Sequence, residues 1–413
     1  MTPQQQGDYA ANLVARIVRE CPRRQPTSDD ERRAHEIVRA ELDAAGCTTW
    51  VHDFRFNDNL HANMALHFGL GTLGTVVSPI APRTALALHA TSTLSFWADS
   101  NRRGYWLRRL LPFKPSRNVV GVLPATSTPR LRIVFLAHVD AAFTGIIFHP
   151  WLLRRTRGDP PRPLRLLRRP TELAVRAQAA LAVIDLLRTV FGVWTLPLVP
   201  IELLLTIPSA LITLANLEIL ARGTVVPGAN DDLSGVAALP LLARRFMNKR
   251  HPDVELVFVA TGCEEASLGG ADALARDMKH TWNPASTVVI ALDQLSLGNL
   301  MYMRAEGEVT RIPAPGWLTT LTEQVAASDP RFAEVVPFEA PVGGTDAGAF
   351  LAHGYDAMAL VCIDPELGAA RHYHRPEDSP ENLDPDKIVY CLDFVEKLVE
   401  AIVGHRLGNS TRA

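Results

Sequence analysis

Four short apolar segments constrain the fold of this chain more than any other feature of its sequence. They span residues 131–137, 254–260, 286–292 and 357–363, and each is followed by polar residues and then by a segment with helical character. This alternation is typical of β-α-β units. Because the segments are apolar almost without interruption, we expect strands that helices cover on both faces. The sequence therefore predicts an α/β protein with a mixed, mostly parallel central sheet flanked by helices.

Both ends of the chain are predicted to be helical. Apolar residues recur at helical spacing over residues 8–20, and Ser28 with Glu31 forms a capping-box pattern ahead of a second helix that Gly46 ends. Residues 384–403 are typical of a final helix that packs on the sheet.

The composition bounds the class of protein and the partners to expect. With 47% hydrophobic and 21% charged residues, the chain can bury a large core, and its net charge of -2 gives no electrostatic reason to expect a nucleic-acid partner. The five cysteines form no C-x-x-C pair, which favours reduced thiols. The N-terminal sequence lacks a signal-peptide pattern, so we expect a cytoplasmic protein.

A histidine and an aspartate follow the first apolar segment. His138 and Asp140 are two residues apart at the predicted carboxyl end of a strand, where α/β proteins bind their ligands. A metal-bound histidine usually donates its other ring N–H to a carboxylate, so we expect Asp140 to orient His138. On this pair alone, a histidine beside an aspartate in a surface loop is the simpler interpretation.

Two adjacent aspartates precede a predicted helix. Asp231 and Asp232 follow a tight loop marked by Gly228 and Asn230, and at least one of them is expected to cap the helix. A carboxylate at this place could also bridge two cations, since two-metal hydrolases hold their ions about 3.5–4 Å apart. We assign the bridging position to Asp231.

Two adjacent glutamates follow the second apolar segment. Glu264 and Glu265 would repel each other unless a cation offsets their charge, and the alternative is a solvated acidic loop. Neighbouring residues on an extended chain point in different directions, so one glutamate can bind a metal while the other moves protons. Asp293 ends the third apolar segment, and His374 lies in a loop before the last helix. This mixture of histidine and carboxylate at successive strand or loop ends suits zinc.

Six motifs in this order resemble metallopeptidase family 28, the co-catalytic two-zinc peptidases that include the bacterial leucyl aminopeptidases and aminopeptidase Y. The motifs are AHVD, PGANDDLSG, ATGCEEASLGG, ALDQ, GGTDAGAFLAHG and YHRPEDSPENLD. The resemblance covers about residues 1–60, 117–141 and 225–405, and the ordered set is far more specific than any single motif.

The resemblance implies two zinc ions per chain and a role for each site residue. It places His138, Asp231 and Asp293 on one zinc, and Asp231, Glu265 and His374 on the other. Glu264 becomes the general base and Asp140 the residue that orients His138. Asp346, in the motif GGTDAGAF, matches a family position near the site. We assign no role to Asp346. The implied function is an aminopeptidase that cleaves N-terminal residues from peptides with a metal-activated water.

Three alternatives stay open at this point. The segment GGTDA is also similar to glutamyl-aminopeptidase and carboxypeptidase-type families of the same clan, so a carboxypeptidase or another amidohydrolase is one alternative. The related glutaminyl cyclases keep one zinc, and the full ligand set argues against them. A non-catalytic receptor or scaffold on the peptidase fold is the third, against which the retention of Glu264 beside Glu265 argues.

Two apolar stretches interrupt the alternation of predicted strands and helices. We expect one catalytic domain over residues 1–413 with an apolar and basic helical hairpin inserted at 62–112 and a basic, then apolar, helical segment inserted at 142–226. Residues 59–82 contain no Lys, Arg, Asp or Glu, and residues 189–217 contain only Glu202.

The two insertions have two interpretations. They could form a helical cap or a homodimer interface, or they could contact a membrane through residues 62–112 and 154–220, with the Arg-rich flanks and the catalytic domain on the cytoplasmic side. Pro197, Pro200 and Pro208 interrupt the longer apolar run, so length alone does not decide.

Overall fold

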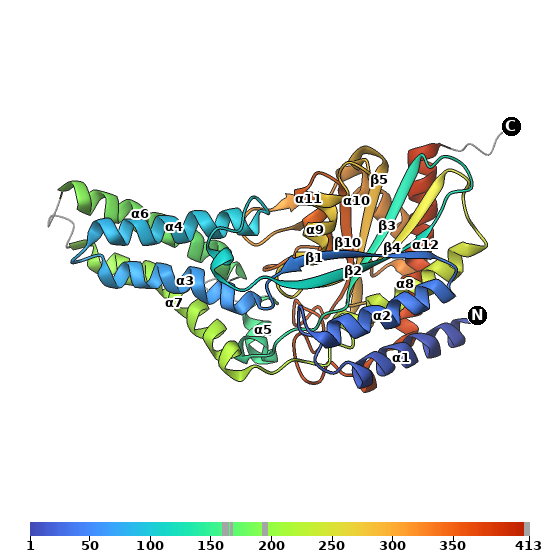
Figure 1. Cartoon of the computed structure of the whole chain (residues 1–413), viewed down its shortest axis with the longest axis horizontal. Coiled ribbons are helices and arrows are strands. Elements are labelled where there is room, and N and C mark those ends of the chain that lie inside the picture. The colour runs from blue at the N-terminus through green and yellow to red at the C-terminus, as the bar shows by residue number, and fades with distance from the viewer. Residues whose placement is uncertain (159–164, 166–167, 192–196, 409–413) are drawn as a thin grey trace.

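An eight-stranded sheet forms the centre of the larger part of the molecule (Figure 1). The computed structural model describes residues 1–158, 165, 168–191 and 197–408. The strand order is β1-β2-β4-β3-β5-β10-β6-β9. The bounds are β1 Thr48–Phe56, β2 Lys114–Leu123, β3 Leu131–His138, β4 Val254–Thr261, β5 Thr287–Asp293, β6 Asn299–Met303, β9 Val336–Phe338 and β10 Asp356–Ile363.

The four predicted strands are present within one or two residues and lie together as β4-β3-β5-β10. These four run parallel. β1 pairs antiparallel with β2, β2 with β4 and β6 with β10, whereas β9 pairs parallel with β6. The mixed, mostly parallel sheet that the sequence predicts is therefore confirmed. Because β3, β4 and β5 run in the same direction, their carboxyl ends meet at one edge of the sheet.

Helices cover both faces of this sheet, as the continuous apolar strands require. Within β3, Phe135 packs into a core with helices of one face, whereas Val134 and Leu136 pack with helices of the other. The first face carries α1 (Pro3–Glu20), α2 (Asp29–Ala44), α8 (Leu233–Met247), α10 (Gly316–Ser328) and α12 (Pro385–Leu407), and the second carries α9 (Gly269–Asp277) and α11 (Asp346–Ala352). A small hairpin, β7 (Ala305–Glu306) with β8 (Ile312–Pro313), lies outside the sheet.

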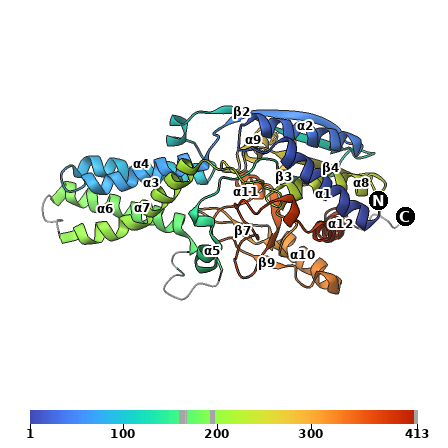
Figure 2. The same cartoon turned by 90° about the horizontal axis from the view of Figure 1, so that it is seen from below.

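The two insertions form a four-helix bundle that projects from one end of the sheet domain (Figures 1 and 2). Its helices are α3 (Leu60–Val77), α4 (Pro82–Ser100), α6 (Pro170–Phe191) and α7 (Val199–Arg222), and α5 (Pro150–Thr156) lies at its base. The helices pack in the cyclic order α3-α4-α6-α7. The expected interruption by proline does not occur within α7, because Pro200 lies in its first turn and the helix continues through Pro208. Pro197 precedes the helix.

Candidate metal centre

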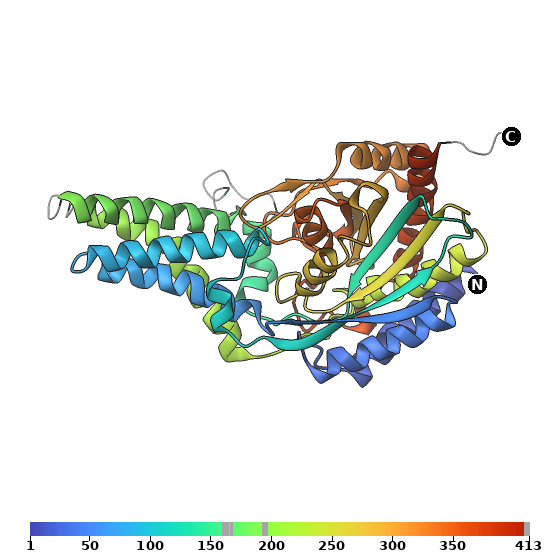
Figure 3. The ribbon, with the colours of Figure 1, turned by 45° about the horizontal axis from the view of Figure 1, so that its top comes forward.

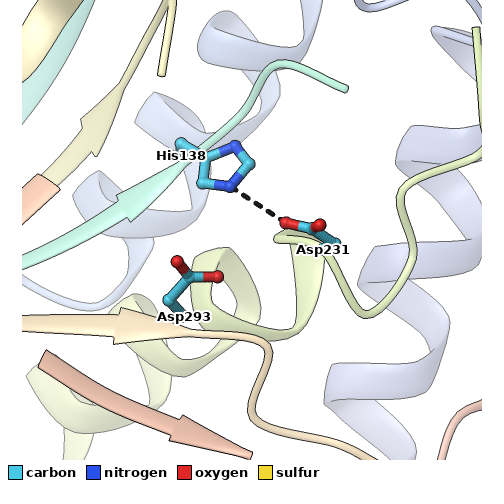
Figure 4. Close-up of side chains that lie close together, drawn as sticks. All are labelled: His138, Asp231 and Asp293. Atoms are coloured by element: carbon cyan, nitrogen blue, oxygen red, sulfur yellow. Dashed lines mark hydrogen bonds and ion pairs between the residues drawn. The ribbon is translucent and has the colours of Figure 1, made fainter. Parts of the chain in front are cut away.

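The predicted site residues meet at the edge where the parallel strands end. His138 is the last residue of β3 and Asp293 the last of β5, while Glu264 and Glu265 lie in the loop that begins two residues before them, after β4. Asp231 comes from the loop before α8, and its side chain points toward those of His138 and Asp293 (Figure 4). His374 lies in the loop between β10 and α12.

The side chains form two triads that share one carboxylate. His138 Nε2 lies 3.2 Å from Asp231 Oδ1, and His374 Nε2 lies 3.3 Å from Asp231 Oδ2 and 3.4 Å from Glu265 Oε1. In each triad, His138 with Asp231 and Asp293, and His374 with Asp231 and Glu265, the candidate ligand atoms lie within 4.8 Å of one another. These are the two sets that the family resemblance implies. Their role as metal ligands stays a prediction.

Unpartnered buried oxygens indicate that a cation belongs in this centre. Among the described residues, the buried atoms Asp231 Oδ2, Glu265 Oε1 and Asp293 Oδ1 accept no hydrogen bond, and the first two have only the ring nitrogen of His374 nearby. Burial raises the pKa of Asp293 well above its ordinary value, and the negative charge of Asp231 raises it further. A buried carboxylate needs a compensating partner, and one histidine with two carboxylates in each triad suits zinc. The residues present therefore fit the metal.

Asp140 contacts both the glutamate loop and His138. Its carboxylate accepts hydrogen bonds from the backbone N–H groups of Glu264 (3.0 Å) and Glu265 (2.9 Å). His138 Nδ1 lies 3.0 Å from the backbone carbonyl oxygen of Asp140 and 3.8 Å from its carboxylate. The orienting role of the Asp140 carboxylate stays a prediction, because the carboxylate is engaged by the glutamate loop and the Asp140 carbonyl is the nearer acceptor for His138. Asp140 thus positions both glutamates.

Asp232 is the helix cap that leaves Asp231 free for the centre. Asp232 Oδ1 accepts from the N–H groups of Gly235 (3.1 Å) and Gln294 (3.0 Å), and Oδ2 accepts from the N–H of His138 (3.1 Å). One carboxylate therefore connects the start of α8 with the ends of β3 and β5. The expectation that at least one of the two aspartates caps the helix is confirmed.

Sequence reasoning missed a buried arginine and an aspartate that hold the loops of the centre. The guanidinium of Arg24 donates to the carbonyl oxygens of Val139 (3.0 Å), Pro227 (2.6 Å) and Gly228 (3.3 Å). Asp378 accepts from the N–H groups of Asn230 (2.7 Å) and Asp231 (3.1 Å). Neither residue has a distinctive sequence signal, since Arg24 is one of two adjacent arginines in a linker and Asp378 one of several acids in an acidic loop.

Glu31 also supports the centre. Ser28 caps α2 as predicted, but the Glu31 carboxylate does not complete the capping box. It accepts instead from the N–H of Cys263 (2.9 Å), the residue before Glu264, and from the hydroxyl of Ser116 (2.8 Å). Burial, with the charge of Asp140, raises the pKa of Glu31 to about 8. The motif therefore found the helix start but not the tertiary role of its acid.

A pocket opens beside the two triads. Glu264 lines it with a side chain that is 11% exposed, and its Oε2 lies 3.9 Å from His138 Nε2. Burial raises the pKa of Glu264 well above its ordinary value, which His138 opposes and Glu265 and Asp346 reinforce. Asp346 accepts a hydrogen bond from the hydroxyl of Thr261, and its other oxygen has no partner among the described residues. The pocket is also lined by Arg102, Arg157, Glu306 and Glu308.

Comparison with known proteins gives one family match and several similar folds. Residues 216–399 match the model of peptidase family M28. A zinc aminopeptidase from Bacillus subtilis has a similar fold at 13% identity, covering 96% of this chain and 94% of that one, with a TM-score of 0.57. An aminopeptidase from Aneurinibacillus sp. strain AM-1 matches at 15% identity over 96% and 93% of the two chains, with a TM-score of 0.54. A glutaminyl cyclase from Porphyromonas gingivalis matches at 14% identity over 96% and 98%, with a TM-score of 0.52.

A comparison with curated protein sequences found no match. The match of residues 216–399 to this family model and the fold shared with zinc aminopeptidases support the resemblance to family M28 that the ordered motifs indicate.

Proposed function

We propose that this chain is a two-zinc aminopeptidase, in which Glu264 is the general base. The observation that carries the proposal is the pair of triads sharing Asp231, because a bridging carboxylate between two His-carboxylate sets is the arrangement that a co-catalytic metal pair needs. Zinc bound there would lower the pKa of an attacking water and polarise the scissile carbonyl.

The chain's own residues account for the proton transfers. The Glu264 carboxylate lines the pocket next to both triads, and the Asp140 carboxylate holds its backbone. In this position Glu264 takes a proton from the attacking water as the new carbon–oxygen bond forms. The same proton then passes to the leaving amine as the carbon–nitrogen bond breaks, so that Glu264 returns to its starting state.

Two observations favour cleavage at the amino end of a peptide substrate. Two of the similar structures are described as aminopeptidases. The pocket also contains Glu306, a buried carboxylate that could pair with a substrate ammonium group, and burial raises its pKa to about 7. The hydrogen bonds from the N–H and hydroxyl of Thr345 fix the orientation of this carboxylate.

Two arginines in the same pocket favour a carboxypeptidase as the second candidate. Arg102 donates to the carbonyl (2.7 Å) and hydroxyl (3.0 Å) of Ser267, and Arg157 lies 4.8 Å from the ring centroid of Tyr373. Among the described residues, neither guanidinium uses all of its donors in hydrogen bonds, so either could bind a substrate carboxylate. Both arginines already contact neighbouring groups, so we favour an aminopeptidase over a carboxypeptidase.

Blocked peptides separate these functions. The zinc-loaded chain is incubated with one short peptide in three forms, with both ends free, with an acetylated N-terminus and with an amidated C-terminus. We expect the acetylated form to resist cleavage and the amidated form to be cleaved. The reverse pattern identifies a carboxypeptidase. Ammonia release from a peptide with an N-terminal glutamine, without cleavage of the chain, identifies a cyclase, and no reaction with any of them supports a scaffold.

A further inference from the structure

The polarity of the four-helix bundle is inverted relative to a bundle that folds in water. Buried side chains between its helices include His67, His89, Gln178, Asp185, Arg188 and Glu202. Large apolar side chains point outward, each more than half exposed, among them Val76, Leu94, Val183, Leu204, Leu211 and Leu214. In water, helices of a bundle bury their apolar stripe and expose their polar face. The distal part of this bundle does the opposite.

The buried polar groups hydrogen-bond from helix to helix. Gln178 of α6 accepts from the hydroxyl of Ser92 in α4 (2.8 Å) and donates to the hydroxyl of Ser209 in α7 (3.1 Å). Arg188 of α6 donates to both oxygens of Glu202 in α7, at 2.7 and 2.9 Å. Such polar contacts hold helices together where the surroundings are as apolar as the helix surfaces themselves.

The helices of the bundle also approach one another closely at two glycines of α3. A Cβ added to Gly71 of α3 would lie 2.1 Å from Gln178 Nε2, and one added to Gly74 would lie 2.7 Å from His89 Nε2. Small residues that let partner side chains reach the helix backbone are characteristic of helix packing in membranes.

The outer surface of the bundle is free of charge along most of its length. In the described parts of the four helices, the exposed charged side chains are Arg83 at the distal start of α4, and Arg176 and Arg222 toward the base. Between these ends, Asp185, Arg188 and Glu202 are buried and paired. The helices have 18, 19, 22 and 24 residues. At 1.5 Å per residue they are about 27–36 Å long, close to the ~30 Å of a bilayer's hydrocarbon core.

The base of the bundle has the features of a membrane–water boundary. Trp97, Trp106 and Trp151 are 40%, 56% and 57% exposed near this end, and the guanidinium of Arg155 lies 4.0 Å from the ring centroid of Trp151. Described arginines also lie at this end: Arg108 and Arg109 in the short helix Leu107–Leu110, which contacts α3 and α4, and Arg154 and Arg155 in α5. Aromatic side chains gather at such boundaries, and lysine and arginine mark the cytoplasmic side. By length and composition alone, α7 qualifies as a membrane span.

We propose that this bundle is embedded in a lipid bilayer, with both helical hairpins crossing it and the catalytic domain on the Arg-rich, cytoplasmic side. All four helices expose apolar side chains, so the apolar surface surrounds the bundle. A second copy of the chain would cover one side of it, whereas lipid covers all sides. The bundle stands clear of the sheet domain in every view (Figure 3). Leu60 and Ser100, at the base of α3 and α4, line the pocket, so the candidate active centre adjoins the membrane surface.

Vesicle flotation tests the lipid contact. The full chain is synthesised in the presence of phosphatidylcholine–phosphatidylglycerol vesicles, washed with alkaline carbonate and floated. We expect the unmodified chain to stay with the vesicles, and the triple variant Leu204→Lys, Leu211→Lys, Leu214→Lys to lose about tenfold or more of this association. The matched control Val336→Lys, which changes an exposed apolar residue of the sheet domain, should float like the unmodified chain. Release by carbonate, or a detergent-free monomer or dimer, overturns the proposal.

Cysteine labelling tests the topology without altering the apolar surface. The five native cysteines are buried, so single cysteines introduced as Arg83→Cys or Arg109→Cys report on the two ends of the bundle. A membrane-impermeant maleimide added to intact cells should label Arg83→Cys, while Arg109→Cys should react only after lysis. Labelling of Arg83→Cys only after lysis overturns the crossing. Both tests are independent of peptidase activity.

Discussion

The side chains of the two adjacent glutamates, Glu264 and Glu265, diverge and contact different groups of the site. Glu265 Oε1 faces His374 Nε2 at 3.4 Å, whereas Glu264 Oε2 lies nearer to His138, at 3.9 Å from Nε2, and lines the pocket. This divergence depends on the hydrogen bonds from both backbone N–H groups to Asp140. The Glu265 carboxylate thereby faces the triad of His374 and Asp231, and the Glu264 carboxylate faces His138 and the pocket.

Replacing each glutamate in turn should separate binding from proton transfer. Glu264→Gln should keep its zinc and lose about 10²–10⁴-fold in kcat, since an amide cannot accept the proton. Glu265→Gln should instead lose zinc affinity, because a neutral amide oxygen is a weaker ligand. The measurements are kcat on a short peptide and zinc content after dialysis, with each variant as the other's control. Equal losses of metal and rate in both variants would contradict the division.

A buried histidine should make the fold sensitive to acid. His35 of α2 is fully buried, with Nδ1 2.9 Å from the carbonyl oxygen of Glu31, and burial lowers its pKa from 6.5 to about 4. As the pH falls from about 6.5 to about 4, the unfolded chain therefore binds a proton that the folded chain does not. Stability should fall over this window by about 3 kcal/mol from this residue.

Urea unfolding between neutral pH and pH 4 measures this effect. His35→Gln should show a smaller loss of stability with acid than the unmodified chain. His280→Gln, at an exposed position, serves as the control and should follow the unmodified chain. Parallel curves for all three proteins would show that His35 does not carry the acid sensitivity.

At the scale of elements, the centre depends on loops that come from distant parts of the chain. Arg24, between α1 and α2, bonds the backbone after β3 and the backbone before α8 at once. Asp378, before α12, fixes the same loop before α8 from the other side. These bonds set the distance between His138 and Asp231, although neither Arg24 nor Asp378 belongs to the triads.

Shortening the arginine should loosen the centre. Arg24→Gln leaves carbonyl oxygens of Val139, Pro227 and Gly228 without their donor, and we expect zinc affinity to fall about 10–100-fold, as for other residues that support metal ligands. Competition with a fluorescent chelator measures this affinity. Arg23→Gln changes the neighbouring, exposed arginine and should leave it unaltered. Unchanged zinc affinity in Arg24→Gln would show that the loops after β3 and before α8 keep their positions without the guanidinium.

At the scale of the whole molecule, metal should stabilise the assembled fold. Both triads draw ligands from several strands and loops, so zinc binds the folded chain in preference to the unfolded one. We expect two zinc ions per chain by elemental analysis, and at a free zinc concentration of ~1,000 times Kd each site should add about 4 kcal/mol. Chelation should therefore lower Tm. One zinc per chain after full reconstitution would refute the two-metal arrangement.

The predicted strands and the motif residues could be found from sequence because their signals are local. Nearly continuous apolar runs identify β3, β4, β5 and β10, and alternation of buried residues then gives each strand two covered faces. The residues of the two triads could be found because each stands at the end of a strand or in a loop of distinctive composition. The predicted roles of these residues await the experiments above.

Tertiary structure alone decided which groups those residues contact. Three of these contacts join segments that are far apart in the chain. The Asp140 carboxylate accepts from the N–H of Glu264, Arg24 donates to the carbonyl of Val139, and Glu31 accepts from the N–H of Cys263. The inward orientation of the polar faces in the four-helix bundle could not be predicted from sequence for a related reason. Apolar and polar residues in its helices reveal two faces, but only packing shows that the polar face is turned inward, since the choice depends on what surrounds the bundle.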